Sequence, residues 1–285
     1  MIPGNNGLGK EAALQLAKHK PAMIFIGSRS IERGTAAIAD IVSLVPNAKL
    51  TLIQMDLASL SSVQAAAKQF LTFSPRLDIL MNNAGIMAVP AQLTADGYEI
   101  QFGTNHLGHA LLTKLLLPTM LHTAQSPGSD VRIITLTSNS HSRAPKDGIE
   151  FDTLRSANGA GSELLRYGQS KLANILHSKE LARRYPSITA VAVHPGMVDT
   201  GLTGTMQKNH ILARILAPIL GQIIGVGVEQ GVLNQLWAAV DKGVESGAYY
   251  EPVGKKSKGS ELSREKKLAG KLWEWTEKEL LKWDI

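Results

Sequence analysis

The feature that most constrains the fold is a regular alternation between two hydrophobic periods along the chain. Short apolar runs, rich in residues that favour β-strands, alternate with longer stretches in which apolar residues recur at helical spacing. Strands joined through helices pair in parallel by right-handed crossovers, with helices on both faces of the sheet. The sequence therefore predicts a doubly wound α/β fold of the Rossmann type. The expected strands cover 22–26, 50–55, 77–81, 131–136 and 189–193, and the expected helices 8–19, 31–44, 59–72, 97–117 and 167–185.

The alternation runs through the chain without a break. No Ser-, Gly- or Pro-rich linker and no internal repeat separates one part from another. We therefore expect a single domain over residues 1–285, with a C-terminal helix over about 262–282. In such a sheet, ligands bind beyond the carboxyl ends of the strands, so the residues that follow each strand are the candidates for function.

Composition excludes several classes of protein. The chain is 44% hydrophobic and has no cysteine, so it can bury a large core but can form neither disulfides nor thiolates. Its net charge of +6 is scattered among acidic residues, which is typical of solvated surfaces and not of a nucleic-acid-binding face. The histidines lack acidic or cysteine partners at ligand spacing, so no metal site is expected. No secretion signal opens the chain, and we expect a cytoplasmic protein.

An apolar stretch over 211–226 resembles a membrane span at first sight. Arg214, Pro218 and Gln222 interrupt it, however, and its unbroken runs are far shorter than the ~20 residues that a spanning helix needs. We interpret the region 199–228 as a mobile lid over an apolar substrate, with peripheral membrane contact as the alternative. Tryptophans at 273, 275 and 283 indicate core packing or a contact between subunits of a homo-oligomer.

Glycines in the loop before the first predicted helix suit a phosphate group. Gly7 and Gly9 would let the backbone approach a pyrophosphate, and the first-turn N–H groups of the helix, starting at Leu8, would offer it positive potential. A glycine turn without a ligand is the alternative interpretation. After the next strand, Arg29 stands where a carboxylate would bind a ribose 2′-hydroxyl. Its guanidinium favours a 2′-phosphate and hence NADP(H) over NAD(H), unless Arg29 is merely solvated.

Two further strand ends carry candidate cofactor contacts. Asp56 and Leu57 follow the third apolar run, and Asn83 follows the fourth. The small residues Ala84 and Gly85 would allow a flat adenine and ribose to pass close to the backbone.

The strongest chemical signal is the pair Tyr167 and Lys171. Four residues apart on a helix, the two side chains share a face. An ammonium near a phenol favours the phenolate, so we expect the pKa of Tyr167 to be lowered toward neutral pH, where it can exchange a proton with a substrate. Ser138 could bind the same substrate oxygen, and Asn105 could hold a water in a proton relay to Lys171. By itself this spacing is more often a surface pair.

At this point the chain resembles the short-chain dehydrogenase/reductases, in particular their retinol-dehydrogenase-like and WW-domain-oxidoreductase-like branch. The resemblance spans about residues 2–280 and rests on five motifs together. These are NNAG at 82–85, NHLGH at 105–109, TLTSNSHS at 135–142, YGQSK at 167–171 and HPGMVDT at 194–200.

The resemblance implies roles for individual residues. It implies catalytic roles for Asn105, Ser138, Tyr167 and Lys171, with Lys171 on the nicotinamide ribose. It also implies that the loop 195–200 faces the nicotinamide carboxamide. Strand ends and resemblance together give the expected cofactor contacts Gly7, Leu8, Gly9, Arg29, Asp56, Leu57, Asn83, Ala84, Gly85, Tyr167, Lys171, Pro195, Gly196, Val198 and Thr200.

The chain departs from the family at its start. The family's loop reads T-G-x-x-x-G-x-G after a complete strand, whereas here Pro3 falls on the first glycine and only two residues precede it. Proline has a fixed φ and no N–H, so it cannot replace that glycine. We therefore expect the first strand to be missing or truncated. One hypothesis is that Met1 is an internal start within a longer chain, and the other is a truncated protein that folds poorly or is inactive.

These features favour an NADP(H)-dependent oxidoreductase that interconverts a hydroxyl and a carbonyl group on a small hydrophobic substrate. The alternative is a catalytically silent member of the family that serves as a binding module. The four candidate catalytic residues favour the enzyme, whereas Pro3 and the short start favour the silent protein.

Overall fold

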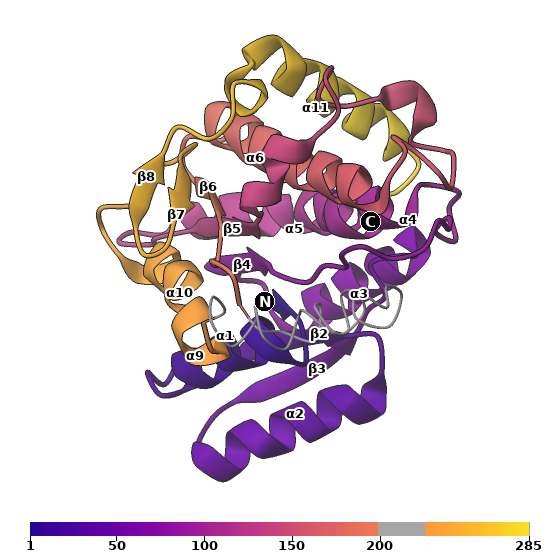
Figure 1. Ribbon diagram of the computed structural model, residues 1–285. Coiled ribbons are helices and arrows are strands. Elements are labelled where there is room, and N and C mark those ends of the chain that lie inside the picture. Colours follow the sequence, from indigo (N-terminus) through magenta and orange to yellow (C-terminus); the bar gives the residue numbers. More distant parts are fainter. Residues whose placement is uncertain (199–225, 285) are drawn as a thin grey trace.

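The sheet has the strand order expected of a Rossmann fold. The computed structural model describes residues 1–198 and 226–284. Three strands pair in the order β1-β2-β3 and five in the order β4-β5-β6-β7-β8, all parallel except for β7 with β8. Backbone hydrogen bonds between Met1 and β4 join the two groups, so the strands run 3-2-1-4-5-6-7-8 (Figure 1). The strands are β1 (Ile2–Pro3), β2 (Ile24–Ser28), β3 (Leu50–Gln54), β4 (Ile79–Asn82), β5 (Arg132–Leu136), β6 (Thr189–Val193), β7 (Tyr249–Glu251) and β8 (Lys255–Ser257).

Helices cover both faces of the sheet, as the alternating pattern predicts. One face packs against α3, α5 and α6, with α11 packed on the outside of α6, and the other face packs against α1, α2 and α10. The longer helices are α1 (Gly7–Ala17), α2 (Ile31–Leu44), α3 (Leu60–Phe73), α5 (Gly108–Ala124), α6 (Glu163–Arg184), α10 (Leu233–Val240) and α11 (Lys266–Glu279). Short helical segments are α4 (Ile100–Phe102), α9 (Val228–Gly231), the π-helical turn η1 (Gly103–Leu107) and the 3₁₀ turns η2 (Asn139–Arg143), η3 (Phe151–Thr153) and η4 (Leu262–Arg264).

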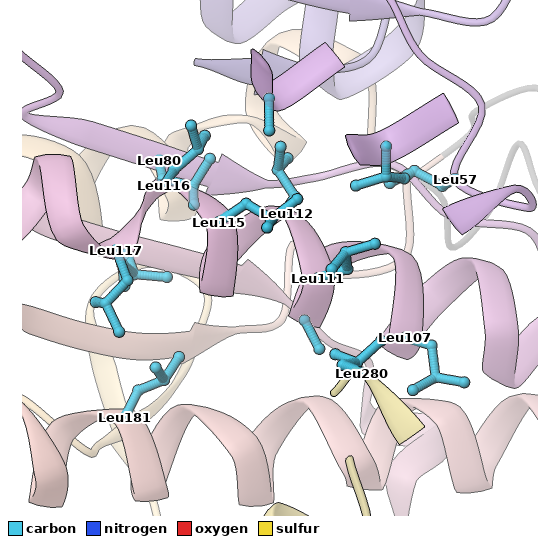
Figure 2. Close-up of a cluster of buried hydrophobic side chains, with 14 of the residues drawn as sticks. Leu57, Leu80, Leu107, Leu111, Leu112, Leu115, Leu116, Leu117, Leu181 and Leu280 are labelled. Carbon is cyan, nitrogen blue, oxygen red and sulfur yellow. The ribbon is translucent and has the colours of Figure 1, made fainter. Parts of the chain in front are cut away.

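Helix α5 lies at the centre of the larger core. Its leucines are buried on all sides of the helix, which is the pattern of a helix enclosed by other elements. Figure 2 shows Leu111, Leu112 and Leu116 of α5 close to Leu57 and Leu80, which come from the β3–α3 connection and β4. Each fully buried leucine contributes roughly 1.5–3 kcal/mol to folding. This core fixes the position of α6, which carries Tyr167 and Lys171, and of α5, which continues directly from the turn η1 that holds Asn105.

Some boundaries differ from the sequence expectations. The helix expected to end before Pro118 continues to Ala124, because its last turn buries Met120 and uses the Thr123 hydroxyl to accept the Leu77 N–H. The helix expected to open at Tyr167 begins at Glu163, where the Ser162 side chain caps it. Strands β7 and β8 were not expected, since runs of three residues carry no clear period.

The first strand is short but not absent. Ile2 pairs with Ile26 of β2, the Met1 ammonium donates to the Ile79 carbonyl at 2.7 Å, and Met81 N–H donates to the Met1 carbonyl. Gly4 N–H donates to Gly27 on the β2 side, so by the alternation of a strand the Pro3 nitrogen faces β4. There the proline removes one donor from the ladder.

A cavity of about 240 Å³ lies beyond the amino end of β1. It is bordered by the first residues of β2 and β4, with apolar side chains such as Ile2, Ile24, Phe25 and Leu77 among its walls. The Met1 amino group is buried beside it, and this burial lowers the pKa of that amine to about 5. The cavity and the amine together make the amino end of β1 a weak point of the sheet.

Extending the chain by three apolar residues, Val-Ile-Val, ahead of Met1 should raise the melting temperature. Continuing the register of Ile2 with Ile26 places these residues opposite 22–24, where they fill the cavity at about 0.8 kcal/mol per buried CH₂. A Gly-Ser-Gly extension is the control, since it removes the buried amine but fills little of the cavity. Equal melting temperatures for the two extended chains would contradict this assignment.

The same three chains give a pH test. Because the folded-state pKa of the amine is about 5 and its ordinary value is 8.0, the unextended chain should lose stability as pH falls from 8 to 5. Both extensions convert the amine to an amide and should remove that loss. Thermal unfolding across this pH range measures it.

Candidate functional site

A cavity of about 380 Å³ opens at the carboxyl ends of the central strands, where a doubly wound sheet binds its ligands. Residues that follow β1, β2, β3, β4 and β5 all border it, together with the face of α6. Its lining comprises Pro3, Gly4, Asn5, Asn6, Gly7, Leu8, Gly27, Ser28, Arg29, Met55, Asp56, Leu57, Asn83, Ala84, Gly85, Ile86, Thr104, Leu136, Thr137, Tyr167, Lys171 and Pro195. Most of the expected cofactor contacts therefore gather in one place.

The glycine loop brings the amino end of α1 to the cavity. Asn6 precedes the helix without a side-chain cap, so the first N–H groups of α1 are left for a ligand. A Cβ on Gly9 would lie 2.9 Å from the Gly4 carbonyl oxygen and 2.6 Å from the Asn83 amide nitrogen. Gly4 itself has a φ of +144° and the same close contact with Asn83. The loop thus needs glycine at both positions.

Arg29 and Asp56 stand on the opposite wall. Arg29 is exposed at the end of β2, and within the described residues its guanidinium has no hydrogen bond or ion pair. Asp56 accepts the Ala58 N–H at 2.9 Å, which fixes the turn after β3. The chemistry of this wall suits the adenosine half of a dinucleotide, with a free cation beside it.

Tyr167 and Lys171 of α6 reach the cavity from the other side. Both are buried, and the Lys171 ammonium lies 5.6 Å from the Tyr167 ring centroid. Lys171 donates to the Leu136 carbonyl at 3.2 Å, which ties it to the end of β5. A Cβ on Gly85 would lie 3.4 Å from this ammonium and 3.1 Å from the Asn105 amide oxygen, so the glycine allows both to approach.

The expectation that Lys171 lowers the pKa of Tyr167 is wrong for this arrangement. Burial raises the pKa of Tyr167 to about 12, against a smaller lowering by the hydrogen bond with Ser138. Burial also lowers the pKa of Lys171 to about 8, which weakens the positive charge it could offer. Desolvation is the largest cause of both pKa shifts because both side chains lie in the protein interior. Tyr167 therefore holds its proton at neutral pH.

Asn105 lies in the π-helical turn η1, a type of turn that is common at functional sites. Its amide nitrogen donates to the Ile86 carbonyl at 2.9 Å and to the Ser170 hydroxyl at 3.0 Å, and its amide oxygen accepts the Ile86 N–H at 2.8 Å. These bonds use both amide hydrogens. Asn105 thus ties the loop after β4 to α6, and its role in a proton relay stays a prediction.

The loop after β6 is described only in part. Pro195 lines the cavity, Gly196 has a φ of +92°, and Val198 pairs with Val226. Thr200 and most of the expected lid over 199–228 lie outside the described residues.

Several contributors to the site were not among the expected residues, and Ile86, Thr137 and His141 are examples. Ile86 and Thr137 each follow a strand end and line the cavity, so their positions alone could have indicated them. His141 Nδ1 donates to the Ser138 carbonyl at 2.7 Å, and its Nε2 accepts the Ser260 N–H at 3.1 Å. It links Ser138 to a segment more than a hundred residues away, which no local pattern reveals.

Two other kinds of site were sought in the described residues. No group of three or more His, Cys, Asp or Glu side chains is placed there to hold a metal ion. No helix in the same residues is long and apolar enough to cross a membrane.

Comparisons with known proteins agree with one another. A sequence model for short chain dehydrogenases matches residues 2–147. The chain is 40% identical to a short-chain dehydrogenase/reductase of Aspergillus calidoustus, over 99% of this chain and 93% of that protein. It is 36% identical to retinol dehydrogenase 12 of Mus musculus, over 94% and 81% of the two chains. The solved structure of an uncharacterised Mycobacterium paratuberculosis protein matches with a TM-score of 0.74 and 30% identity, over 97% and 91% of the two chains.

Proposed function

Since the chain belongs to the short-chain dehydrogenase/reductase family, in its retinol-dehydrogenase-like branch, we propose that it is an NADP(H)-dependent oxidoreductase that interconverts a hydroxyl and a carbonyl group. The observation that carries this proposal is the cavity that joins the α1 glycine loop to Tyr167 and Lys171. Nicotinamide supplies the hydride chemistry, and the chain supplies binding, orientation and the proton.

The residues present fit a dinucleotide. Uncapped N–H groups of α1 would hold the pyrophosphate. The small residues Ala84 and Gly85 would leave room for the ribose close to the backbone. Lys171 would bind the second ribose from α6. The guanidinium of Arg29, which has no partner among residues 1–198 and 226–284, supports a 2′-phosphate and hence NADP(H).

Tyr167 would act as the proton donor. Its pKa of about 12 keeps the hydroxyl protonated at neutral pH, and Ser138 shares the substrate oxygen. A protonated phenol next to a carbonyl oxygen favours reduction, because the oxygen gains the proton as hydride reaches the carbon. The site therefore supports carbonyl reduction as the direction at neutral pH.

A small hydrophobic substrate is the remaining part of the proposal. Its support is the apolar sequence over 211–226 and apolar lining residues such as Ile86 and Leu136. Straight-chain aldehydes from butanal to decanal, with NADPH consumption as the readout, provide the probe. We expect catalytic efficiency to rise with chain length, at about 0.8 kcal/mol per CH₂ that becomes buried. Flat or falling efficiency along the series would count against a hydrophobic substrate.

The silent binding module is the second candidate, favoured by Pro3 and the cavity beside Met1. Fluorescence titration with NADPH separates the two. A protein that binds no NADPH would support the silent module.

Arg29→Ala should remove most of the preference for NADPH over NADH. Loss of a charge-assisted contact to phosphate weakens binding by roughly ten- to a hundredfold, whereas NADH affinity should stay unchanged. Arg33→Ala is the matched control, since Arg33 is exposed on α2 and does not line the cavity. Titration of each variant with both cofactors measures the preference. Equal affinity of the unsubstituted protein for both would refute the assignment to NADP(H).

Tyr167→Phe should retain NADPH binding and lose turnover by roughly 10²–10⁴-fold, the usual contribution of general acid catalysis. Tyr185→Phe at the far end of α6 is the control and should leave turnover unchanged. Steady-state rates with the best aldehyde of the series give the comparison. Undiminished turnover in Tyr167→Phe would show that another group donates the proton.

Lys171 should give the reduction rate its pH dependence. Because the pKa of its ammonium is about 8, kcat should be constant on the acid side and fall as pH rises through that value. Lys171→Met should lack this inflection and also bind NADPH more weakly. A pH–rate profile with the same inflection in both proteins would contradict the role of Lys171.

A further inference from the structure

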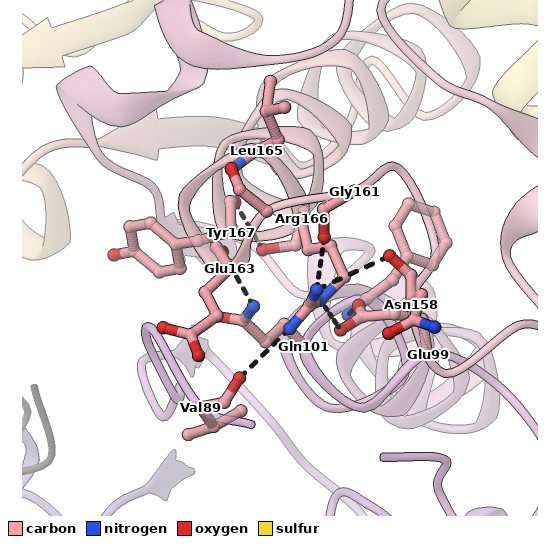
Figure 3. A network of polar contacts seen from close by, with 12 residues as sticks. Val89, Glu99, Gln101, Asn158, Gly161, Glu163, Leu165, Arg166 and Tyr167 are labelled. Carbon is pink, nitrogen blue, oxygen red and sulfur yellow. Dashed lines mark hydrogen bonds and ion pairs between the residues drawn. The ribbon is translucent and has the colours of Figure 1, made fainter. Parts of the chain in front are cut away.

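A buried cluster of polar side chains holds the first turns of α6, and neither the motifs nor the cavity includes it. Arg166, the residue before Tyr167, lies at its centre, and Glu99 and Gln101 complete it (Figure 3). We call these three residues the α6 clamp. All three are buried, although arginine and glutamate rarely are unless they are paired.

The guanidinium of Arg166 bonds to two separate segments outside its own helix. It donates to the Glu99 carboxylate at 3.1 Å and to the Val89 carbonyl at 3.2 Å, in the connection that follows β4. It also donates to the carbonyls of Asn158 and Gly161, in the loop that leads into α6. The fixed fork of a guanidinium suits such a many-sided contact, which a lysine could not reproduce.

Gln101 makes a second connection between the same two segments. Its amide nitrogen donates to the Glu163 carbonyl at 2.9 Å, and its amide oxygen accepts the Ala88 N–H at 2.9 Å. The clamp thereby joins the connection after β4 to the first residues of α6. Around it the chain is less enclosed, since Gly161 and Ser162 are exposed.

The opposite side of this part of α6 packs tightly on the turn that follows Ser138. A Cβ on Gly168 would lie 2.7 Å from the Ser140 carbonyl oxygen, so helix and turn are in backbone contact. Along the chain, Tyr167 lies between Arg166, which belongs to the clamp, and Gly168, which makes the contact with the turn. The clamp therefore holds the start of α6 on the side away from η2, and with it the distance between Tyr167 and Ser138.

We propose that Arg166 is a positioning residue. Together with Glu99 and Gln101 it fixes the distance between the side chains of Tyr167 and Ser138. This proposal rests on the function proposed above. The clamp touches neither the cavity nor Lys171, so it acts through the placement of the tyrosine. A small misplacement of a reacting group can reduce a rate by roughly a hundredfold.

The test is a double-mutant cycle between the clamp and Tyr167. The clamp is neutralised by the pair E99Q and R166M together, because removing one charge alone would leave the other buried without a partner. R166K is the second variant, which keeps the charge pair but not the fork. R183M is the control, since Arg183 is exposed near the end of the same helix. Each change is made with Tyr167 and with Phe at position 167, using NADPH and the best aldehyde of the series.

With Tyr167 present, the neutralised clamp should lower kcat by roughly 10- to 100-fold, with NADPH affinity and melting temperature close to those of the control. R166K should lower kcat less. With Phe at position 167, both changes should lower the residual rate by less than about twofold, because the group they position is gone.

An equal fall in both backgrounds, or no fall in either, would overturn the proposal and leave the proposed function standing. If Y167F alone turned over aldehyde like the parent, the proposed function would fail instead, so the two failures are distinct. Should the neutralised clamp not fold, R166K in the two backgrounds decides by the same comparison.

Discussion

The hydrogen bonds of the first four residues hold the two halves of the sheet together. Met1 bonds to β4 through its nitrogen and its carbonyl, and Gly4 bonds to β2 through its N–H. The Asn83 side chain adds a bond to the Pro3 carbonyl at 3.1 Å. These contacts bring the glycine loop beside Asn83–Gly85, so both walls of the cavity depend on a strand of two residues. The cavity beside Met1 borders the same strand, so the candidate cofactor site depends on the few hydrogen bonds that hold β1 between β2 and β4.

Burial decides the chemistry at the other end of the cavity. Desolvation raises the pKa of Tyr167 and lowers that of Lys171, so the pair consists of a protonated phenol and a weakly basic amine. Burial is the reason, and no acidic side chain among the described residues is close enough to either group to contribute to its shift. In the proposed reaction this arrangement would suit proton donation to a carbonyl, with a pH dependence near the pKa of Lys171. The leucine core around α5 also includes residues of α6 and β5. By packing α6 on β5, it buries Tyr167 and Lys171.

Much of the fold could be predicted because its signals are local. The five expected strands lie within a few residues of their positions, since apolar runs and the helices between them each show in a short window. The strand-end residues Arg29, Asp56 and Asn83 meet as expected, because parallel strands gather their carboxyl ends at one edge. Non-local effects escaped prediction. The pKa of Tyr167 depends on total burial, the α6 clamp joins residues 67 positions apart, and Met1 completes the sheet through contacts with residues 79 and 81.

The most direct test of the central claim is transfer of a label. NADPH carrying deuterium at both positions of the reactive carbon of its nicotinamide ring would be incubated with decanal and the protein, and the alcohol product analysed by mass spectrometry. Hydride transfer at this site predicts one deuterium on the carbinol carbon of each product molecule. Y167F should form far less of the same labelled product. Alcohol without deuterium, or no alcohol at all from a protein that binds NADPH, would contradict the account.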